Sequence, residues 1–319
     1  MPIDSQKHYY KQNRLKQLRA FCYAAQTSSI SQAAEQMFLS QPSISLLVKA
    51  LEKDLDQNLF ERKGPKIHLT DEGRILLELA LPLVEGLETL PETFIERCRN
   101  EVSGELNIAA SESSILYILP EIIKRFKNEY PHIQVQLSNV TGRDGQSLLR
   151  SGKVDFAVGS MLDIPNDIIY IPTHSYDPFL ITPINHPLTE KKDISIADIS
   201  PYGLILPPRH LTTWRLVDFV FQQHEVNYHV ELEAGGWEVI KKYVTLGLGI
   251  SIVSSICLSG KEKLAKIPLN KYFPKRNYGI VVRRGKFLSP AARCFFRLMD
   301  NELLEMFYED GTSEKPGLA

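Results

Sequence analysis

The stretch "SISQAAEQMFLSQPSISLLVKALE", residues 29–52, decides the fold of the first part of the chain. Apolar side chains recur at helical spacing in residues 33–37 and again in residues 44–55, with only a few residues between the two segments. In that gap Ser40 can cap a helix, and Pro42 fits its first turn because the N–H that proline lacks would have no partner there. The sequence therefore predicts a helix-turn-helix. Its second helix is expected to bury Ile44, Leu47, Leu51 and Leu55.

The segments on either side of this helix-turn-helix add a helix and two strands to it, and together they form what is here called the head. Residues 14–27 carry one apolar stripe at helical spacing, which predicts a further helix before the pair. The stretch "LFERKGPKIHLTDEG", residues 59–73, places a turn at Gly64-Pro65 between two short extended pieces. We interpret these pieces as a two-stranded wing that carries basic side chains.

A long helical pattern occupies residues 71–99 and begins at a capping residue, Thr70 or Asp71. Its apolar positions are spaced by 4, 3, 4, 3 and 4 residues, which is the spacing of a heptad seam in a dimer. Pro82 and Pro91 interrupt the pattern, and each should kink the helix by removing one backbone hydrogen bond. A hinge is expected at residues 100–104. The seam consists of Leu76, Ala80, Leu83, Leu87, Leu90 and Phe94.

Strand and helix patterns alternate after residue 104. This alternation predicts parallel sheets covered by helices, in two lobes with a cleft between them. Ligands of such sheets bind at the carboxyl ends of the strands. Strands are expected at residues 106–110, 133–137, 154–159, 178–182, 203–206, 230–233 and 250–253. Helices are expected at residues 115–128, 145–151, 213–224 and 237–246.

The composition bounds the class of protein. The chain has 319 residues, of which 43% are hydrophobic and 24% charged, as expected for a soluble protein of two or three domains. It contains no run of about 18 apolar residues, and its first residues are polar, so we expect a cytoplasmic protein without a membrane partner. Residues 1–70 carry ten Lys and Arg against six Asp and Glu, a balance of +4, whereas the remaining 249 residues carry −5. A basic head on an acidic body suggests that the head alone meets a polyanion.

Enzyme and metal motifs fail on their spacing. In "HEVNYH", residues 224–229, the histidines are five residues apart, whereas a zinc-binding HExxH motif needs them four apart. No GxSxG, Walker A or GxGxxG motif follows a predicted strand. We therefore expect neither an enzyme nor a cofactor. The cysteines form no CxxC pair, and we predict that they are buried free thiols. They are Cys22, Cys98, Cys257 and Cys294.

At this point the residues resemble a known family. The run from "LRAFCYAA", residues 18–25, through the opening stretch to "LTDEG", residues 69–73, is similar to the DNA-binding head of LysR-type transcriptional regulators. The resemblance continues through "EVIKKYVTLGLGISIVSS", residues 238–255, which looks like the effector-domain signature of the family. Within the family, "SGKVDFAVGS" and "ITPINHPL" are most similar to the regulators of cysteine biosynthesis.

The resemblance implies a fold in three parts. An α winged helix-turn-helix domain is joined by a linker helix to an α/β effector domain of two lobes, like a periplasmic binding protein. We predict the DNA-binding domain at residues 1–70, the dimerising linker helix at 71–99, the effector domain at 105–302 and a C-terminal tail at 303–319. Lobe I would comprise residues 105–163 and 268–302, and lobe II residues 164–267. The family also implies a homotetramer, promoter DNA as a partner, and RNA polymerase if the protein activates transcription.

The outer face of the second helix of the pair suits the major groove of DNA. Its small polar and basic side chains can contact base edges while the wing meets the phosphate backbone. From the residues alone, a solvated helix face with capping serines explains the pattern equally well; the resemblance favours DNA. Leu46 departs from the polar residue usual in the family, although its side chain could contact a thymine methyl group. The predicted DNA-binding residues are Gln41, Pro42, Ser43, Ser45, Lys49, Arg62 and Lys66.

A serine-rich turn, "ASESSILYILP" at residues 110–120, joins the first strand of the body to its helix. Hydroxyls and backbone N–H groups at such a turn can bind a small anion or simply cap the helix, and the residues alone leave both interpretations open. In the cysteine-regulator branch, hydroxyl residues line a pocket for an acyl-serine or an oxyanion. The resemblance therefore implies a small anionic or acyl-serine-like effector, held by hydroxyls without a Lys or Arg. The implied pocket residues are Ser111, Ser113, Ser114, Ser160 and Thr212. The rival hypothesis is a cytoplasmic solute-binding or sensor protein whose head contacts something other than DNA.

Overall fold

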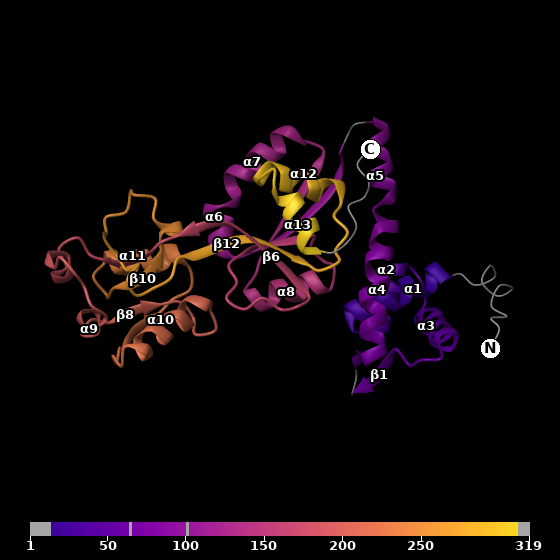
Figure 1. Ribbon diagram of the computed structural model, residues 1–319, viewed down its shortest axis with the longest axis horizontal. Helices are drawn as coiled ribbons and strands as arrows, with labels where there is room; N and C mark the ends of the chain where they lie inside the picture. The colour runs from indigo at the N-terminus through magenta and orange to yellow at the C-terminus, as the bar shows by residue number, and fades with distance from the viewer. Residues whose placement is uncertain (1–13, 64–65, 100–101, 312–319) are drawn as a thin grey trace.

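The computed structural model describes residues 14–63, 66–99 and 102–311. A small helical head lies at one end of the molecule, a long helix stands beside it, and two α/β lobes extend away from that helix (Figure 1). The chain thus has the three parts that the sequence predicts.

The head contains the predicted helix-turn-helix. Helices α1 (Arg14–Thr27), α2 (Ile30–Met37) and α3 (Gln41–Leu55) precede strands β1 (Phe60–Lys63) and β2 (Lys66–Leu69), which pair antiparallel as a wing. The predicted turn at residues 64–65 lies outside the described residues. The side chain of Ser40 accepts the backbone N–H of Ser43 at 3.3 Å, so the predicted cap of α3 is present.

Small side chains let the three helices of the head approach closely. Ala24, Ala33 and Ala34 pack against Ile44 of α3 in one buried cluster. One predicted core position is wrong. Leu55 is 40% exposed, and α3 buries Val48 instead. The buried side chains of α3 are Ile44, Val48 and Leu51.

The linker comprises α4 (Asp71–Glu88) and α5 (Leu90–Arg99). Thr70 caps α4 through the N–H of Gly73 at 2.9 Å, and a Cβ at residue 73 would lie 2.2 Å from the carbonyl oxygen of Leu59. Only glycine therefore fits where the linker leaves the wing. Pro82 lies inside α4 without ending it, whereas the helix is interrupted at Thr89, just before the first turn of α5 that contains Pro91.

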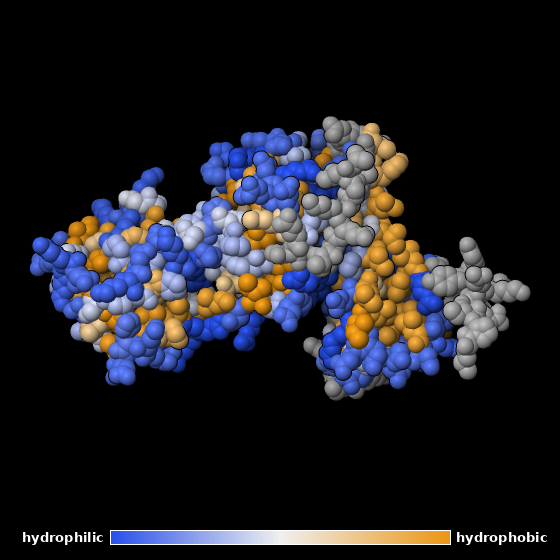
Figure 2. All heavy atoms as spheres, in the orientation of Figure 1, coloured by the Kyte–Doolittle hydropathy of each residue, from blue (hydrophilic) through white to orange (hydrophobic). Residues whose placement is uncertain are grey.

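The apolar seam of the linker differs from the predicted one in its first half. Leu76 and Ala80 pack on the helices of the head, so they are not available to a partner. The linker also exposes Ile95, and its other exposed apolar side chains, here called the linker stripe, are Ile75, Leu79, Leu83, Leu87, Leu90 and Phe94. They form a continuous apolar surface along the linker helices (Figure 2). The shift arises because α4 must bury one face on the head before it can present another to a partner.

Lobe I is built on a five-stranded sheet in the order β4-β3-β5-β12-β6. Its strands are β3 (Gly104–Ala110), β4 (Ile133–Asn139), β5 (Phe156–Gly159), β6 (Ile168–Tyr176) and β12 (Arg276–Arg283). Only β4, β3 and β5 are parallel, because β12 runs antiparallel to both β5 and β6. The prediction of purely parallel sheets is therefore wrong, since it lacked the two strands by which the chain leaves lobe I and returns to it.

The helices of lobe I are α6 (Glu112–Tyr117), α7 (Leu119–Glu129), α8 (Gly142–Arg150), α12 (Pro290–Met299) and α13 (Leu303–Gly311). The single helix predicted at residues 115–128 is two helices, because Pro120 cannot donate to the preceding turn and instead occupies the first turn of α7. Helix α13 packs its side chains Leu303 and Phe307 into the main core. We therefore propose that the effector domain extends through α13 and that the tail is shorter than predicted.

Lobe II contains two small sheets, β10-β7-β11 and β8-β9. Its strands are β7 (Pro178–Thr182), β8 (Leu204–Leu206), β9 (Val230–Glu233), β10 (Ser251–Ser254) and β11 (Ala265–Pro268). Its helices are η1 (Pro187–Glu190), α9 (Ile196–Ile199), α10 (Thr212–Gln223), α11 (Trp237–Thr245) and η2 (Ser255–Cys257). Because β6 still pairs within the sheet of lobe I, we propose that the chain enters lobe II near residue 177 rather than at residue 164.

Candidate functional site

The outer face of α3 carries the residues predicted to bind DNA. Gln41, Pro42 and Lys49 are exposed, while Ser43 and Ser45 are half-buried. The hydroxyl of Ser43 also shares a 2.8 Å hydrogen bond with that of Ser40. The capping interpretation is therefore correct for Ser40 and Ser43, and the DNA-binding interpretation stays a prediction.

The wing supplies the other two predicted residues. Arg62 and Lys66 lie on the paired strands β1 and β2, where Arg62 is opposite Ile67 and Lys66 is opposite Lys63. Sequence reasoning missed Phe38, which ends α2 in the left-handed conformation and is 95% exposed, and Leu46 is 71% exposed. The head thus presents two large apolar side chains beside its polar face.

The serines at the start of α6 form hydrogen bonds with one another or with the opposite lobe. Ser111 caps α6, and its hydroxyl lies 2.9 Å from that of the fully buried Ser114. The hydroxyl of Ser113 accepts a 2.7 Å hydrogen bond from the indole N–H of Trp237 on α11. Ser113 thereby ties lobe I to lobe II, and its oxygen is already engaged.

The other two predicted hydroxyls, those of Ser160 and Thr212, both accept hydrogen bonds from Arg276, a cation that the sequence did not reveal. Arg276, the first residue of β12, donates from Nε to the hydroxyl of Ser160 at 3.3 Å and from its two terminal nitrogens to the hydroxyls of Thr212 and Thr213. The guanidinium carbon also lies 5.8 Å from the ring centre of Tyr278. The expectation of a cleft without Lys or Arg is therefore wrong. Arg276 is 116 residues from Ser160 and 64 from Thr212, so only the fold brings it there.

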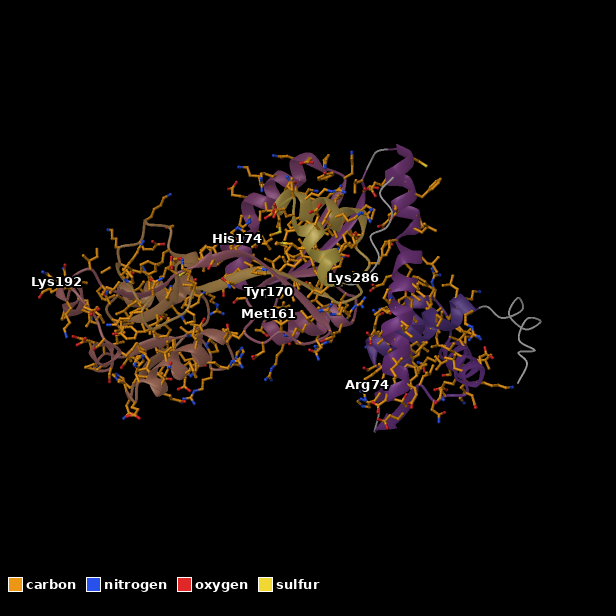
Figure 3. All side chains as sticks on the ribbon, viewed as in Figure 1. Arg74, Met161, Tyr170, His174, Lys192 and Lys286 are labelled. Atoms are coloured by element: carbon orange, nitrogen blue, oxygen red, sulfur yellow. The ribbon has the colours of Figure 1, made fainter. Side chains whose placement is uncertain are left out.

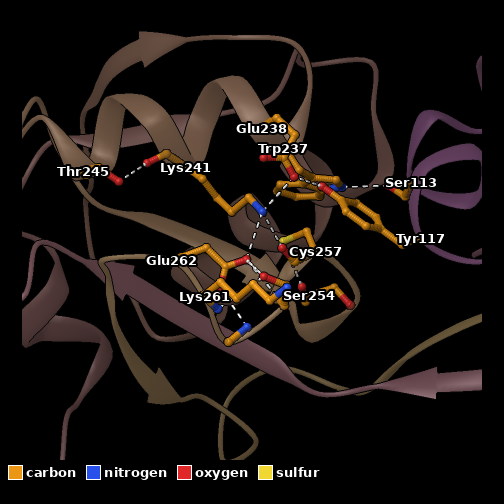
Figure 4. A network of polar contacts seen from close by, with 12 residues as sticks. Ser113, Tyr117, Trp237, Glu238, Lys241, Thr245, Ser254, Cys257, Lys261 and Glu262 are labelled. Atoms are coloured by element: carbon orange, nitrogen blue, oxygen red, sulfur yellow. Dashed lines mark hydrogen bonds and ion pairs between the residues drawn. The ribbon is translucent and has the colours of Figure 1, made fainter.

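A second polar cluster joins the lobes, and in it one ammonium group faces two carboxylates (Figure 4). The ammonium group of the buried Lys241 lies 2.6 Å from the carbonyl oxygen of Cys257, 2.8 Å from Glu238 and 3.2 Å from Glu262. Tyr117 of lobe I donates to Glu238 at 2.5 Å, and burial together with this hydrogen bond raises the pKa of the Tyr117 hydroxyl. The cluster is thus a structural contact between α6 and α11.

The thiols differ from the prediction at one position. All four cysteines are free; Cys22, Cys257 and Cys294 are buried, but Cys98 is exposed on α5. Burial raises the pKa of the Cys22 thiol and of the Cys257 thiol to about 12. These two thiols are therefore protonated at neutral pH and unreactive.

A buried ion cluster attaches the linker to lobe I. Glu85 of α4 lies 2.7 Å from Arg283 at the end of β12 and 3.6 Å from Lys286, which in turn lies 4.0 Å from Asp155. Figure 3 shows Lys286 on the side of lobe I that faces the linker. Burial raises the pKa of Asp155, although Lys286 and the N–H of Asn107 counteract it. Here Glu85, Asp155, Arg283 and Lys286 are called the linker ion cluster.

Two known family models match this chain, one in its head and one in its body. Residues 15–74 match the model "Bacterial regulatory helix-turn-helix protein, lysR family", and residues 99–303 match the model "LysR substrate binding domain". The chain belongs to the LysR family. LysR-family proteins are DNA-binding transcriptional regulators that respond to small molecules, and they are not enzymes. This family assignment argues against the rival hypothesis of a solute-binding or sensor protein whose head contacts something other than DNA.

Individual relatives point to two regulatory contexts. A "Probable RuBisCO transcriptional regulator" of Trichormus variabilis is 29% identical over 302 residues, which cover 92% of this chain and 88% of the relative. The "HTH-type transcriptional regulator cbl" of Escherichia coli is 28% identical over 270 residues, which cover 82% and 84%. The regulatory domain of Synechocystis CcmR, solved in complex with 2-PG, is 25% identical with a TM-score of 0.58, covering 62% of this chain and 96% of that domain. The identities to the two relatives are too similar to assign one branch.

In residues 14–63, 66–99 and 102–311, no helix is long and apolar enough to cross a membrane. The same residues contain no group of three or more His, Cys, Asp or Glu side chains suited to a metal ion.

Proposed function

We propose that this LysR-family regulator reads promoter DNA with the outer face of α3 and is controlled by a small anion bound between its two lobes. The proposal for DNA rests on one observation: Gln41, Pro42 and Lys49 are exposed beside the half-buried Ser43 and Ser45. This face projects from α3 opposite its buried Ile44, Val48 and Leu51. Arg62 and Lys66 of the wing are proposed to neutralise phosphates.

The DNA-binding residues can be tested by salt titration of binding to a promoter fragment that the protein occupies in cells. Ser45→Arg or Lys49→Ala should weaken specific binding by roughly 1–3 kcal/mol if a base contact is lost. Arg62→Ala should weaken binding to all sequences alike and reduce the salt dependence, because a phosphate contact releases counterions. Lys192→Ala is a matched control, since Lys192 lies at the far end of lobe II from the head (Figure 3). Unchanged footprint and affinity in a folded Ser45→Arg, Lys49→Ala double variant would remove α3 as the reading helix.

The effector is proposed to bind where the strand ends of both lobes meet. Ser111 and Ser160 follow β3 and β5 of lobe I, and Thr212 begins α10 of lobe II. The CcmR domain was solved in complex with 2-PG, which supports a small anionic ligand, and the resemblance to the cysteine regulators keeps an acyl-serine or a sulfur oxyanion among the candidates. At about 100 times its dissociation constant, such a ligand should stabilise the folded domain by roughly 2.7 kcal/mol. Thr212→Val should abolish the resulting shift in melting temperature.

Self-association is proposed to occur through the linker stripe, with a tetramer as the complete assembly. The stripe consists of large apolar side chains that the described residues of its own chain leave exposed. A cytoplasmic location, and contact with RNA polymerase if the protein activates transcription, complete the proposal. Sedimentation of the full chain tests the assembly directly.

A further inference from the structure

Among the described residues, Arg276 is a cation held only by neutral groups. Its three hydrogen bonds go to the hydroxyls of Ser160, Thr212 and Thr213, and the structure gives it no ion pair with an acidic side chain among the described residues. The side chain is half-buried between the lobes. An arginine fork binds carboxylate, sulfate or phosphate oxygens more strongly than hydroxyls, because both partners then carry charge and two parallel hydrogen bonds can form.

The contrast with the other polar clusters singles out this residue. Lys241 has Glu238 and Glu262 within 3.2 Å, so its charge is already compensated. Arg283 has Glu85 at 2.7 Å. The charges of these two cations are compensated within the folded chain. The charge of Arg276 has no carboxylate partner among the described residues, so it can bind an anionic ligand.

The groups around Arg276 can also bind an anion themselves. A hydroxyl can accept and donate at once, so Ser160, Thr212 and Thr213 can keep accepting from Arg276 while their O–H groups donate to ligand oxygens. Helix α10 starts at Thr212 without a side-chain cap, so the N–H groups of its first turn lack a side-chain acceptor. One small ligand could therefore be bound by a guanidinium, by hydroxyls from both lobes and by backbone N–H groups together.

We propose that Arg276 is the anion receptor of the effector cleft and determines which effectors bind. This inference rests on the proposed effector function of the cleft and narrows its ligand class. The effector is a small molecule with a carboxylate, sulfate or phosphate group. That group carries at least one full negative charge, shared by two or more of its oxygens. A cationic amine close to that group disfavours binding, because it is repelled by the guanidinium.

Calorimetry on the full-length protein tests the proposal at constant ionic strength set with sodium chloride. The probes are sulfate, phosphate, N-acetylserine, its uncharged carboxamide, and O-acetylserine, which carries an ammonium group beside its carboxylate. Wild type should bind at least one of the first three and should bind the carboxamide about 10- to 100-fold more weakly than N-acetylserine, because charge-assisted hydrogen bonds are lost. O-acetylserine should bind more weakly than N-acetylserine. These comparisons need no variant.

Variants then assign the effect to Arg276. Arg276→Gln should weaken binding of the charged probe about 10- to 100-fold, and Arg276→Lys should fall between it and wild type, because it keeps the charge and loses the fork. Arg215→Gln is the matched control, since Arg215 lies on the same helix α10 but is exposed, 3.9 Å from Asp163. Its affinity should stay within about threefold of wild type.

Two results would overturn the proposal: wild type that binds none of the charged probes, or an Arg276→Gln protein that binds them as wild type does. DNA binding of the same preparations separates this failure from failure of the proposed function. If Arg276→Gln retains both effector and DNA binding, the regulator and its cleft stand and only the role of Arg276 is lost. If wild type fails to bind any promoter DNA, the proposed function itself is wrong.

Discussion

The linker stripe allows a quantitative test of assembly through one side chain. Leu83 of α4 is 64% exposed, and it lies one helical turn from two further members of the stripe, Leu79 and Leu87. Leu83→Ala should leave the fold of the chain intact, because the side chain makes no part of a buried cluster. Its effect should instead appear in self-association.

The expected magnitude follows from the exposed surface. Complete burial of a leucine side chain stabilises by about 1.5–3 kcal/mol, so covering the exposed part of Leu83 contributes about 1–2 kcal/mol. A twofold dimer contains the residue twice, which gives about 2–4 kcal/mol for the interface. Alanine keeps one methyl group, so we expect the lower part of this range, a dimer dissociation constant raised about 30- to 100-fold.

Analytical ultracentrifugation across a concentration series measures this constant. Glu78→Ala is a matched control, because Glu78 is exposed on the same helix but is no member of the stripe. The control should dissociate as wild type does. If Leu83→Ala and Glu78→Ala are indistinguishable, the subunits associate through some other surface, and the stripe needs another explanation.

Two further predictions concern the buried charges. Glu85→Gln should lower the apparent free energy of unfolding in urea by roughly 3–5 kcal/mol, because it leaves the charges of Arg283 and Lys286 largely uncompensated between α4 and lobe I. Burial alone would raise the pKa of Glu262, but the N–H of Ser259 and a neighbouring ammonium group hold it below its ordinary value of 4.5. A folded-state pKa below the unfolded one gives stability that is complete above about pH 4.5 and is lost as the pH falls further. Urea titrations of Glu262→Gln should therefore show a smaller loss of stability on acidification than wild type.

The head was predictable because its signals are local. Ser40 and Pro42 mark the start of α3 within three residues, and the periodicity of its apolar side chains fixes the buried face. The error at Leu55 arose at the end of a helix, where the same periodicity continues but the side chain is 40% exposed. Local patterns state which face of a helix is apolar, but not which positions on that face a neighbouring segment covers.

The body was harder to predict because its decisive contacts join distant segments. Strands β6 and β12 were missed, and with them the antiparallel half of the sheet in lobe I. Their close pairing depends on Gly279, where a Cβ would lie 2.0 Å from the carbonyl oxygen of Ile171. The hydroxyls of Ser160 and Thr212 could be named from the sequence, but the guanidinium that joins them could not.

Two neighbouring strands place the proposed effector site and the linker at opposite ends of the same strand pair. Strand β12 begins with Arg276 at the proposed site and ends with Arg283 in the linker ion cluster. Its partner β5 is flanked in the same way, by Ser160 at the cleft and by Asp155 at the cluster. Eight residues of strand span about 25 Å, and the middle of β12 is buried and paired on both sides. A displacement of β12 along its axis therefore cannot move Arg276 relative to its hydroxyls without also moving Arg283 relative to Glu85.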